Sequence, residues 1–149
     1  MAQKTVAISV TSNRAKVESE VTQAINRALE ICGGKAETYA KKLCPVDTGY
    51  LRNSIAHGRT GGKMSVDTYR SDNGGKQNKP IRSGKYDKPI PESDKPTMII
   101  GTNVEYAPYQ EIGYHKGNKL IGGKKFMSKA LSDHINEYKE VFEGELKKI

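Results

Sequence analysis

The fold turns on a stretch of twelve residues that reads Cys44-Pro45-Val46-Asp47-Thr48-Gly49-Tyr50-Leu51-Arg52-Asn53-Ser54-Ile55. Pro45 disfavours the α region at the residue before it, so a helix that arrives there has to end. Asp47 or Thr48 can then cap the backbone N–H groups that follow, and Gly49 can adopt a positive φ. The stretch therefore predicts a joint of defined geometry, in which these residues act in folding.

Regular structure is predicted to resume directly after this joint. Four residues recur at helical or short extended spacing, namely Tyr50, Leu51, Ser54 and Ile55. Arg52 lies among them, and we expect its guanidinium to form an ion pair with Glu105 or Glu111. An exposed pair of this kind adds only about 0 to 1 kcal/mol.

Before the joint, the sequence predicts one long amphipathic helix. Small or apolar residues recur there at spacings of three or four, namely Val17, Val21, Ala24, Ala28, Cys32, Ala36, Tyr39 and Leu43. Thr11, Ser12 or Asn13 offers an N-cap. Gly33-Gly34 costs about 1 kcal/mol per glycine relative to alanine, but the apolar phase continues through it. We therefore expect a continuous or mildly kinked helix rather than a helical hairpin.

Three further segments are predicted to be strands. Residues 5–10 alternate apolar with small or polar side chains, which is typical of a strand at a sheet edge. Residues 55–62 lead into a Gly-rich connection, after which residues 64–69 and 97–102 are expected to pair as a long hairpin. Residues 72–95 between them contain three prolines and few apolar side chains, which predicts a long mobile loop.

The C-terminal part of the chain predicts two more helical segments. Residues 106–112 are expected to form a short helical turn with Pro108 near its start. Apolar residues at helical spacing then predict one terminal helix over residues 126–146. Two helices packed on a small antiparallel sheet with long loops make an α+β fold, and residues 1–149 are expected to form a single domain.

Composition limits the class of protein. Only 35% of the 149 residues are hydrophobic and none is Trp, so we expect part of the chain to be loop or to be buried only against neighbouring copies. No apolar run approaches the roughly 18 residues of a membrane span, and residues 4–10 are too short and polar for a signal peptide. We expect no membrane partner. Cys32 and Cys44 lack histidines at metal-binding spacing and are expected to be buried thiols.

None of the motifs that match a catalytic signature has the sequence context that the chemistry requires. Asp47-Thr48-Gly49 matches the triplet of aspartic proteases, but there the triplet follows an apolar strand, whereas here a helix precedes it. Four Gly-Gly-Lys tripeptides lack the continuation that a nucleotide-binding P-loop requires. His57, His115 and His134 have no acidic or cysteine residue at ligand spacing, and His134 falls on an apolar helix face. We expect no catalytic residue, no cofactor and no metal.

The net charge of +8 is unevenly distributed along the chain. Residues 113–125 form a basic loop without an acidic residue, and its lysines are Lys116, Lys119, Lys124 and Lys125. Three tyrosines lie close by in sequence, Tyr106, Tyr109 and Tyr114. Aromatic and basic side chains together can stack and neutralise single-stranded nucleic acid. Tyrosines are equally favoured at protein interfaces, because they combine a large rigid area with a hydroxyl group.

Two blocks of the sequence resemble one family of phage proteins. The first block, residues 45–55, resembles the signature of the tail-completion or minor head-tail joining proteins found in phage and prophage necks. The second, residues 99–113, is similar to that family's apolar strand followed by Tyr-Ala-x-x-x-Glu-x-Gly, with Tyr106 and Glu111 at the matching positions. Residues 126–131 are a third, shorter match. The likeness extends over roughly residues 15 to 146, with a gap at residues 72–95.

This resemblance implies a structural, non-enzymatic virion protein that completes the head-proximal end of a tail and joins the tail to the head. It implies a ring of identical subunits, often six-fold, around the channel through which DNA passes without sequence-specific contacts. The partners would be further copies and other neck and tail proteins, in the host cytoplasm during assembly and then in the virion. We expect Tyr106, Tyr109, Glu111 and the four lysines to form the attachment surface. The net positive charge favours an alternative function, that of a basic nucleic-acid-binding accessory protein.

Overall fold

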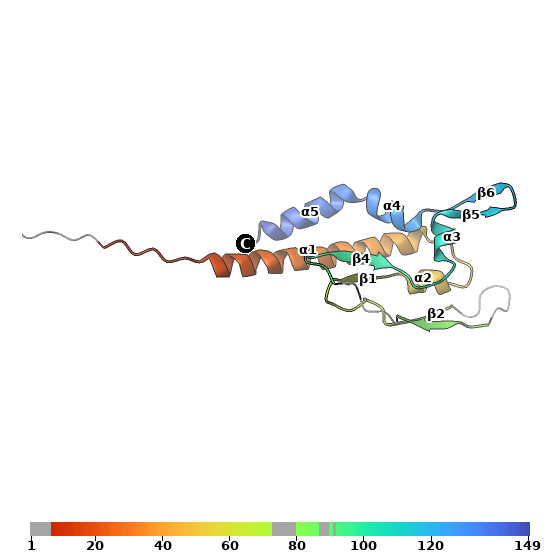
Figure 1. The fold of residues 1–149 in the computed structure, drawn as a ribbon, viewed down its shortest axis with the longest axis horizontal. Helices are drawn as coiled ribbons and strands as arrows, with labels where there is room; N and C mark the ends of the chain where they lie inside the picture. Colours follow the sequence, from red (N-terminus) through yellow and green to blue (C-terminus); the bar gives the residue numbers. More distant parts are fainter. Residues whose placement is uncertain (1–6, 73–79, 87–89, 91) are drawn as a thin grey trace, which may run out of the picture.

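The computed structural model describes residues 7–72, 80–86, 90 and 92–149. One long helix lies beside the C-terminal helices, while small antiparallel sheets lie along it or project beyond its end (Figure 1). In chain order the elements are α1 (Arg14–Leu43), α2 (Tyr50–Ser54), β1 (Ala56–Arg59), β2 (Thr68–Arg70), β3 (Ser83–Lys85), β4 (Met98–Gly101), α3 (Ala107–Glu111), β5 (Gly113–Lys116), β6 (Lys119–Gly122), α4 (Phe126–Ser132) and α5 (Ile135–Leu146). The predicted α+β class is confirmed.

The buried face of α1 consists of small residues. These are Ala24, Ala28, Cys32, Gly33, Ala36 and Ala40. Because their side chains are short, α4, α5, β1 and β4 all pack directly on this one helix. The helix begins after Asn13, and the hydroxyl of Ser12 accepts a hydrogen bond from the N–H of Arg14 at 3.4 Å. It passes through Gly33 and Gly34 without a break, as predicted.

The main hydrophobic core lies near the C-terminal end of α1. Leu51, Ile55 and Phe126 are at most 4% exposed and pack there with Tyr69 and Val104. These five residues come from α2 and the residue after it, β2, the segment after β4, and α4. The core therefore joins the segments on either side of the 44–55 joint to the last third of the chain.

A polar cluster fixes α5 to α1. Glu137 accepts hydrogen bonds from Lys35 Nζ at 2.5 Å and from the hydroxyl of Tyr39 at 2.7 Å. The ring of His134 stacks on that of Tyr39, with centroids 3.5 Å apart and planes 4° from parallel. His134 is thus packed against α1, as its place on an apolar helix face suggested. The hydrogen bonds outweigh a small effect of burial and lower the pKa of Glu137.

The terminal helix is interrupted, so the prediction of one helix over residues 126–146 is wrong. α4 ends at Ser132, and His134 has a non-helical φ of −119° and ψ of 16° before α5 begins. In an unbroken helix the carbonyl of Ala130 would accept the N–H of His134, but here it accepts the hydroxyl of Tyr138 at 2.6 Å. His134, whose ring stacks on that of Tyr39, lies at the break between α4 and α5. Tertiary contacts therefore override the helical pattern.

The strand pairing also differs from the prediction. β4 pairs with β1, with Ile100 opposite His57, whereas residues 64–69 were expected to be its partner. Within that segment Met64 forms an isolated bridge to Gly58, while Thr68 and Tyr69 belong to β2, which pairs with β3. The predicted hairpin of residues 64–69 with 97–102 is therefore wrong. The buried residues of β1, Ala56 and Gly58, are small, so its sequence shows no apolar alternation that would have revealed it.

The predicted loop over residues 72–95 contains ordered structure. Its residues 83–85 form β3, and the hydroxyl of Tyr86 donates to the carbonyl oxygens of Ser54 and Gly101, the latter at 2.9 Å. Ile90 is 9% exposed. Residues 73–79, 87–89 and 91 lie outside the described residues. The described part of this segment includes a strand, the partly buried Tyr86 and the buried Ile90, which corrects the prediction of a loop throughout.

The segment before α1 does not form the predicted strand. Residues 7–13 are neither helix nor strand, and residues 5 and 6 lie outside the described residues. The side chains of Ile8 and Val10 are exposed, with 84% and 88% of their surface accessible. Figure 1 shows this segment leading away from the body of the molecule, beyond every described strand. An alternating pattern is present, but no described strand of the same chain lies beside it.

We predict opposite effects for alanine at the two adjacent glycines of α1. A Cβ atom at Gly33 would lie 2.7 Å from Cδ2 of His57, whose ring is held by two glutamates, and 2.7 Å from Sδ of Met98. At Gly34 the nearest atom is 4.0 Å away. Gly33→Ala should lower the free energy of unfolding by about 1 kcal/mol or more. Gly34→Ala should raise it by about 0.5 to 1 kcal/mol.

Urea denaturation of both variants beside the wild type measures this difference. Because each variant adds the same methyl group to the same helix, intrinsic helix propensity affects both equally. Equal stabilisation by the two substitutions would show that β1 and β4 do not approach α1 as closely as described.

Candidate functional site

The joint has the backbone geometry that the sequence predicted. Gly49 has a φ of 75° and is the N-cap residue of α2. The hydroxyl of Thr48 accepts a hydrogen bond from the N–H of Tyr50, the first residue of α2, at 3.4 Å, whereas the N-cap residue Gly49 makes no side-chain cap hydrogen bond. The carbonyl of Thr48 accepts the N–H of Asp72 at 2.7 Å. A Cβ atom at Gly49 would lie 2.1 Å from a carboxylate oxygen of Asp72, so glycine is required twice over.

Asp72, rather than Glu105 or Glu111, is the acidic partner of Arg52. The Arg52 guanidinium contacts Oδ2 of Asp72, and Asn53 Nδ2 donates to Oδ1 at 2.9 Å. The predicted ion pair of Arg52 with Glu105 or Glu111 is wrong. β2 packs beside α2, and Asp72, two residues after β2, therefore lies next to Arg52. Arg52 and Asn53 thereby fasten the chain after β2 to the joint.

Two residues of the motif belong to the interior. Leu51 is 4% exposed and Ser54 is fully buried. The hydroxyl of Ser54 lies 2.7 Å from the carbonyl oxygen of Leu51 and 2.5 Å from Oγ1 of Thr102. Together with the hydroxyl of Tyr86 on the Ser54 carbonyl, these bonds tie α2 to the segment after β4. Leu51 and Ser54 therefore hold the joint in place from inside.

The two sequence blocks meet in one cleft at the end of the molecule. Its volume is about 500 Å³, and one part of its wall is Pro45–Leu51 from the joint. The remainder comes from Pro80, Arg82, Tyr106 and Gln110. The guanidinium of Arg82 lies 5.4 Å from the ring centroid of Tyr50, close enough for a cation–π contact. Asp47 is the one carboxylate among the described lining residues, so those residues do not supply the paired acids of an aspartic protease.

Glu111 ties α3 to the start of α4. Its Oε2 and Oε1 atoms accept the backbone N–H groups of Met127 and Ser128, each at 2.9 Å, and the Ser128 hydroxyl also donates to Oε1. Burial alone would raise the pKa of Glu111, but these hydrogen bonds outweigh burial and lower it. Lys125 adopts the left-handed region, with a φ of 53°, and its N–H donates to the Glu111 carbonyl at 3.0 Å. Glu111 is thus a positioning residue beneath the surface formed by its neighbours.

Residues 113–125, predicted to be a loop, contain the β5–β6 hairpin. Gly113 pairs with Gly122 and Lys116 with Lys119, and Gly117 at the turn has a φ of 60°. Figure 1 shows the hairpin projecting beyond the end of the molecule. Its two-residue turn and the backbone bonds that anchor it give a fixed shape where a mobile segment was expected.

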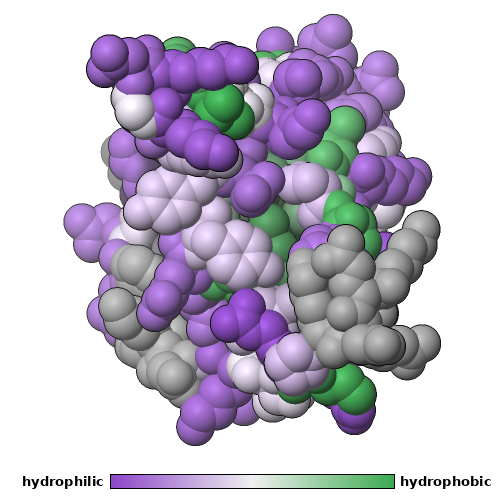
Figure 2. Space-filling model, turned by 90° about the vertical axis from the view of Figure 1, so that its right-hand side faces the viewer, coloured by the Kyte–Doolittle hydropathy of each residue, from purple (hydrophilic) through white to green (hydrophobic). Residues whose placement is uncertain are grey.

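The hairpin and α3 present exposed aromatic, aliphatic and basic side chains together. The rings of Tyr109 and Tyr114 lie edge to face, with centroids 6.3 Å apart. Ile112 is 74% exposed. We call this the hairpin surface, which consists of Tyr109, Ile112, Tyr114, Lys116, Lys119, Lys124 and Lys125. Leu120, which is 62% exposed, lies opposite His115 and therefore on the other face of the hairpin from Tyr114. Figure 2 views this end of the molecule, where hydrophilic side chains surround small apolar areas.

The structure therefore divides the predicted interface residues into three groups. Tyr109 and the four lysines lie on the hairpin surface, Tyr106 lines the cleft, and Glu111 is committed to α4. Sequence reasoning missed Ile112, because a single apolar residue in a strand or turn gives no sign of which side it faces.

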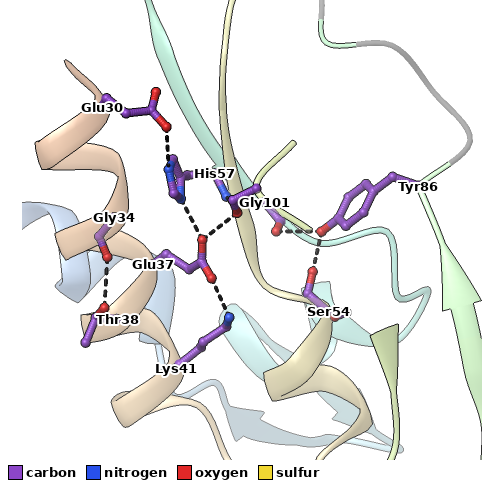
Figure 3. A network of polar contacts seen from close by, with 10 residues as sticks. Glu30, Gly34, Glu37, Thr38, Lys41, Ser54, His57, Tyr86 and Gly101 are labelled. Atoms are coloured by element: carbon purple, nitrogen blue, oxygen red, sulfur yellow. Dashed lines mark hydrogen bonds and ion pairs between the residues drawn. The ribbon is translucent and has the colours of Figure 1, made fainter. Parts of the chain in front are cut away.

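A second polar cluster was not foreseen from the sequence. His57 lies between two acids of α1, with Nδ1 2.6 Å from Oε2 of Glu37 and Nε2 3.3 Å from Oε1 of Glu30 (Figure 3). The Ser65 hydroxyl donates to the same Oε2 of Glu37 at 2.6 Å, and Lys41 contacts the other oxygen. Burial would raise the pKa of Glu37, but the bonds from Lys41, Ser65 and His57 lower it.

This cluster has the residue types of a hydrolase triad without its arrangement. A nucleophilic serine needs its hydroxyl on a histidine nitrogen, whereas Ser65 and His57 both donate to one carboxylate oxygen of Glu37. The cluster therefore fixes β1 and the following turn to α1. Glu30 and Glu37 are seven residues apart on one helix face, which was the available signal for it.

The remaining expectations on cysteines, metals and membranes can be compared with the described residues. Cys32 and Cys44 are free and buried, as predicted, and burial raises the pKa of Cys44 to about 11. In the described part of the chain no group of three or more His, Cys, Asp or Glu residues could hold a metal ion. Within the described residues, no helix combines the length and the apolar character that crossing a membrane requires.

We predict that Glu111→Gln lowers the free energy of unfolding by about 1 kcal/mol at pH 7, because the amide cannot accept all three hydrogen bonds at the start of α4. The folded-state pKa of Glu111 is lowered, so its contribution is fully present above the unfolded pKa of about 4.3 and is lost as the pH falls through the folded value. Urea titrations of both proteins at pH 7 and near pH 3 give the difference. Glu105→Gln, at an exposed position nearby, is the control. A difference that grows on acidification would contradict the assignment.

Comparison of the chain with protein-family models, with curated proteins and with solved structures found no significant match. Its function therefore has to be inferred from its own residues and their geometry.

Proposed function

We propose that this protein is a structural component of a phage or prophage neck, which completes the head-proximal end of a tail and joins it to the head. In this role identical subunits form a ring around the DNA channel. The protein acts by binding and positioning other proteins, and its side chains perform no chemical step. Its place is the virion, after assembly in the host cytoplasm.

One observation carries the proposal. The two blocks that resemble the neck family are separated by more than forty residues in the sequence, yet Pro45–Leu51 of the first and Tyr106 of the second line the same cleft. If the resemblance arose from helix and turn patterns alone, the two blocks would not be expected to lie together in the folded chain. The blocks instead share one surface, as expected if they are retained for a common contact.

The hairpin surface suits attachment to another protein. Tyr109 and Tyr114 are rigid and partly exposed, and the neighbouring Ile112 is 74% exposed. Such a group, surrounded by charged residues, is the usual composition of a protein interface. The lysines around it would speed association with an acidic partner without adding much to the final affinity. The cleft beside it would receive a segment of the same partner.

The same surface gives some support to a second candidate, a basic nucleic-acid-binding accessory protein. Lys116 and Lys119 lie at the hairpin tip near the exposed ring of Tyr114, an arrangement that can contact phosphates and stack on a base. The two functions differ in salt dependence. Binding of short DNA by this route would weaken steeply with salt, by about one unit of logarithmic slope for each phosphate neutralised.

A tail-completion assay tests the proposal. Purified protein is added to tail tubes that lack it, and completed, head-attached particles are counted. Tyr109→Ala should remove a packed anchor and weaken attachment by about 2 kcal/mol, or roughly thirtyfold. Replacing Lys124 and Lys125 by glutamine should mainly slow attachment and reduce its salt dependence. Replacing Lys16 and Lys147 by glutamine, away from this surface, is the charge-matched control.

The outcomes separate the candidates. Wild-type completion by both hairpin-surface variants would contradict the assignment of this surface. Tight binding of short DNA with a steep salt slope, together with no effect on tail tubes, would replace the proposal by the second candidate.

A further inference from the structure

An apolar groove runs between β4 and the C-terminal helices. Its volume is about 410 Å³, and its floor is formed by small residues of α1, including Gly33. Met98, Ile99 and Ile100 of β4 form one side, and Leu131 and Phe142 form the other. All four residues of β4 are only partly buried. The groove therefore leaves aliphatic and aromatic side chains partly accessible in the isolated chain.

The groove follows the edge of β4. Successive residues of a strand point to opposite faces, so three consecutive residues can line one groove only along the edge of the strand. The N–H of Thr60 donates to the carbonyl of Thr97 at 3.0 Å, which continues the β1–β4 ladder. With that alternation, Met98 and Ile100 direct their backbone N–H and C=O groups away from β1. No described strand pairs with this edge.

An open edge beside an apolar groove is a site for an added strand. Such a strand must have about the length of β4, which is four residues, and must point apolar side chains into the groove from alternate positions. It must also be exposed in its own chain, outside any helix or strand there. Few segments of a folded protein meet all three conditions.

The segment before α1 meets them. Ala7–Val10 has the length of β4, and Ile8 and Val10 alternate with the small residues Ala7 and Ser9. Both large side chains are more than four-fifths exposed, and the segment is not part of any helix or strand. Its pattern is that of a strand, and only a partner is missing.

The partner cannot be the groove of the same chain. Gly33 in the groove floor lies nineteen residues from Arg14 along α1, a distance of about 28 Å at 1.5 Å per residue. Ile8 is six residues from Arg14 and can reach back at most about 22 Å even when fully extended. Val10 falls shorter still. Figure 1 shows the segment pointing away from the body.

We propose that Ala7–Val10 of one chain adds as a strand to the free edge of β4 in a second copy and places Ile8 and Val10 over the groove. The donor segment and the acceptor groove are different surfaces, so each chain can donate to one neighbour and accept from another. Such a contact propagates head to tail and closes into a ring where the rotation allows. This inference goes beyond the proposed function, because it specifies how copies join whatever particle they serve.

The first test is the oligomeric state of the full chain, measured by light scattering over a range of concentrations. The wild type should self-associate. Ile8→Asp combined with Val10→Asp should raise the apparent dissociation constant on the order of a hundredfold, because two apolar side chains lose their burial. Both positions are exposed in the single chain, so the fold and its circular dichroism should not change. Val17→Asp, at a 51% exposed position on α1, is the matched control and should associate like the wild type.

The second test identifies the contact. Ile8→Cys chains are mixed with Met98→Cys chains under mild oxidation, and linked peptides are identified by mass spectrometry. Met98 shares with His57 the face of the sheet that is turned to α1, so a disulfide between residues 8 and 98 of different chains, or between residue 8 and Cys32 in the groove floor, is expected. Val17→Cys mixed with Met98→Cys should give no such link.

Three results would overturn the inference: a wild type that remains monomeric at its highest soluble concentration, unchanged association of the Ile8 and Val10 variant, or equal cross-linking by the Val17 control. Neither test contains DNA or tail components, so failure here is distinct from failure of the proposed function.

Discussion

The close packing of β1 and β4 against the small-residue face of α1 is the constraint on which the rest of the structure depends. At Gly33 there is no room for even one methyl group between the helix and the side chains of His57 and Met98. The short side chains of this face also let α4 and α5 pack closely on α1. Because α1 buries little apolar area per residue, polar clusters centred on Glu37 and Glu137 reinforce the packing on both sides.

The joint after α1 converts this packing into a surface. Pro45 ends the helix, Gly49 turns the chain at positive φ, and Leu51 anchors α2 in the core. The cleft is what remains between this turn and the segment carrying Tyr106. Glu111 then holds α3 against α4, so that the β5–β6 hairpin projects from a rigid base. The proposed attachment surface is thus positioned by buried and partly buried residues that would not themselves touch a partner.

Sequence reasoning succeeded where one local cause determines the outcome. The long helix followed from an unbroken apolar phase, and the joint followed from a proline, a hydroxyl and a glycine in order. The short helix at Ala107–Glu111 followed from Pro108 at its start. Even Gly33-Gly34 was placed correctly in the helix, although the reason for Gly33, close contact with strands far along the chain, is visible only in the structure.

The failures concern partners distant in sequence. β1 buries only the small residues Ala56 and Gly58, so its sequence lacks the apolar alternation of a strand, and its pairing with β4 identifies it. The interruption at His134 depends on a ring stacked on Tyr39, which no periodicity records. The hairpin was a different kind of failure, because its turn, Gly117-Asn118, is a recognised two-residue hairpin signal that the lysine count obscured. The cleft itself needed both blocks in space before it could be found.

The central claim is that the cleft and the hairpin surface are the part of the molecule that docks in the neck. Hydrogen–deuterium exchange of the full protein, alone and bound to tail ends that lack it, tests this claim most directly. The account predicts that exchange slows on docking in residues 45–51 and 106–122, while the buried middle of α1 is unchanged. Slowing confined to other segments, with residues 45–51 and 106–122 exchanging as in the free protein, would contradict it.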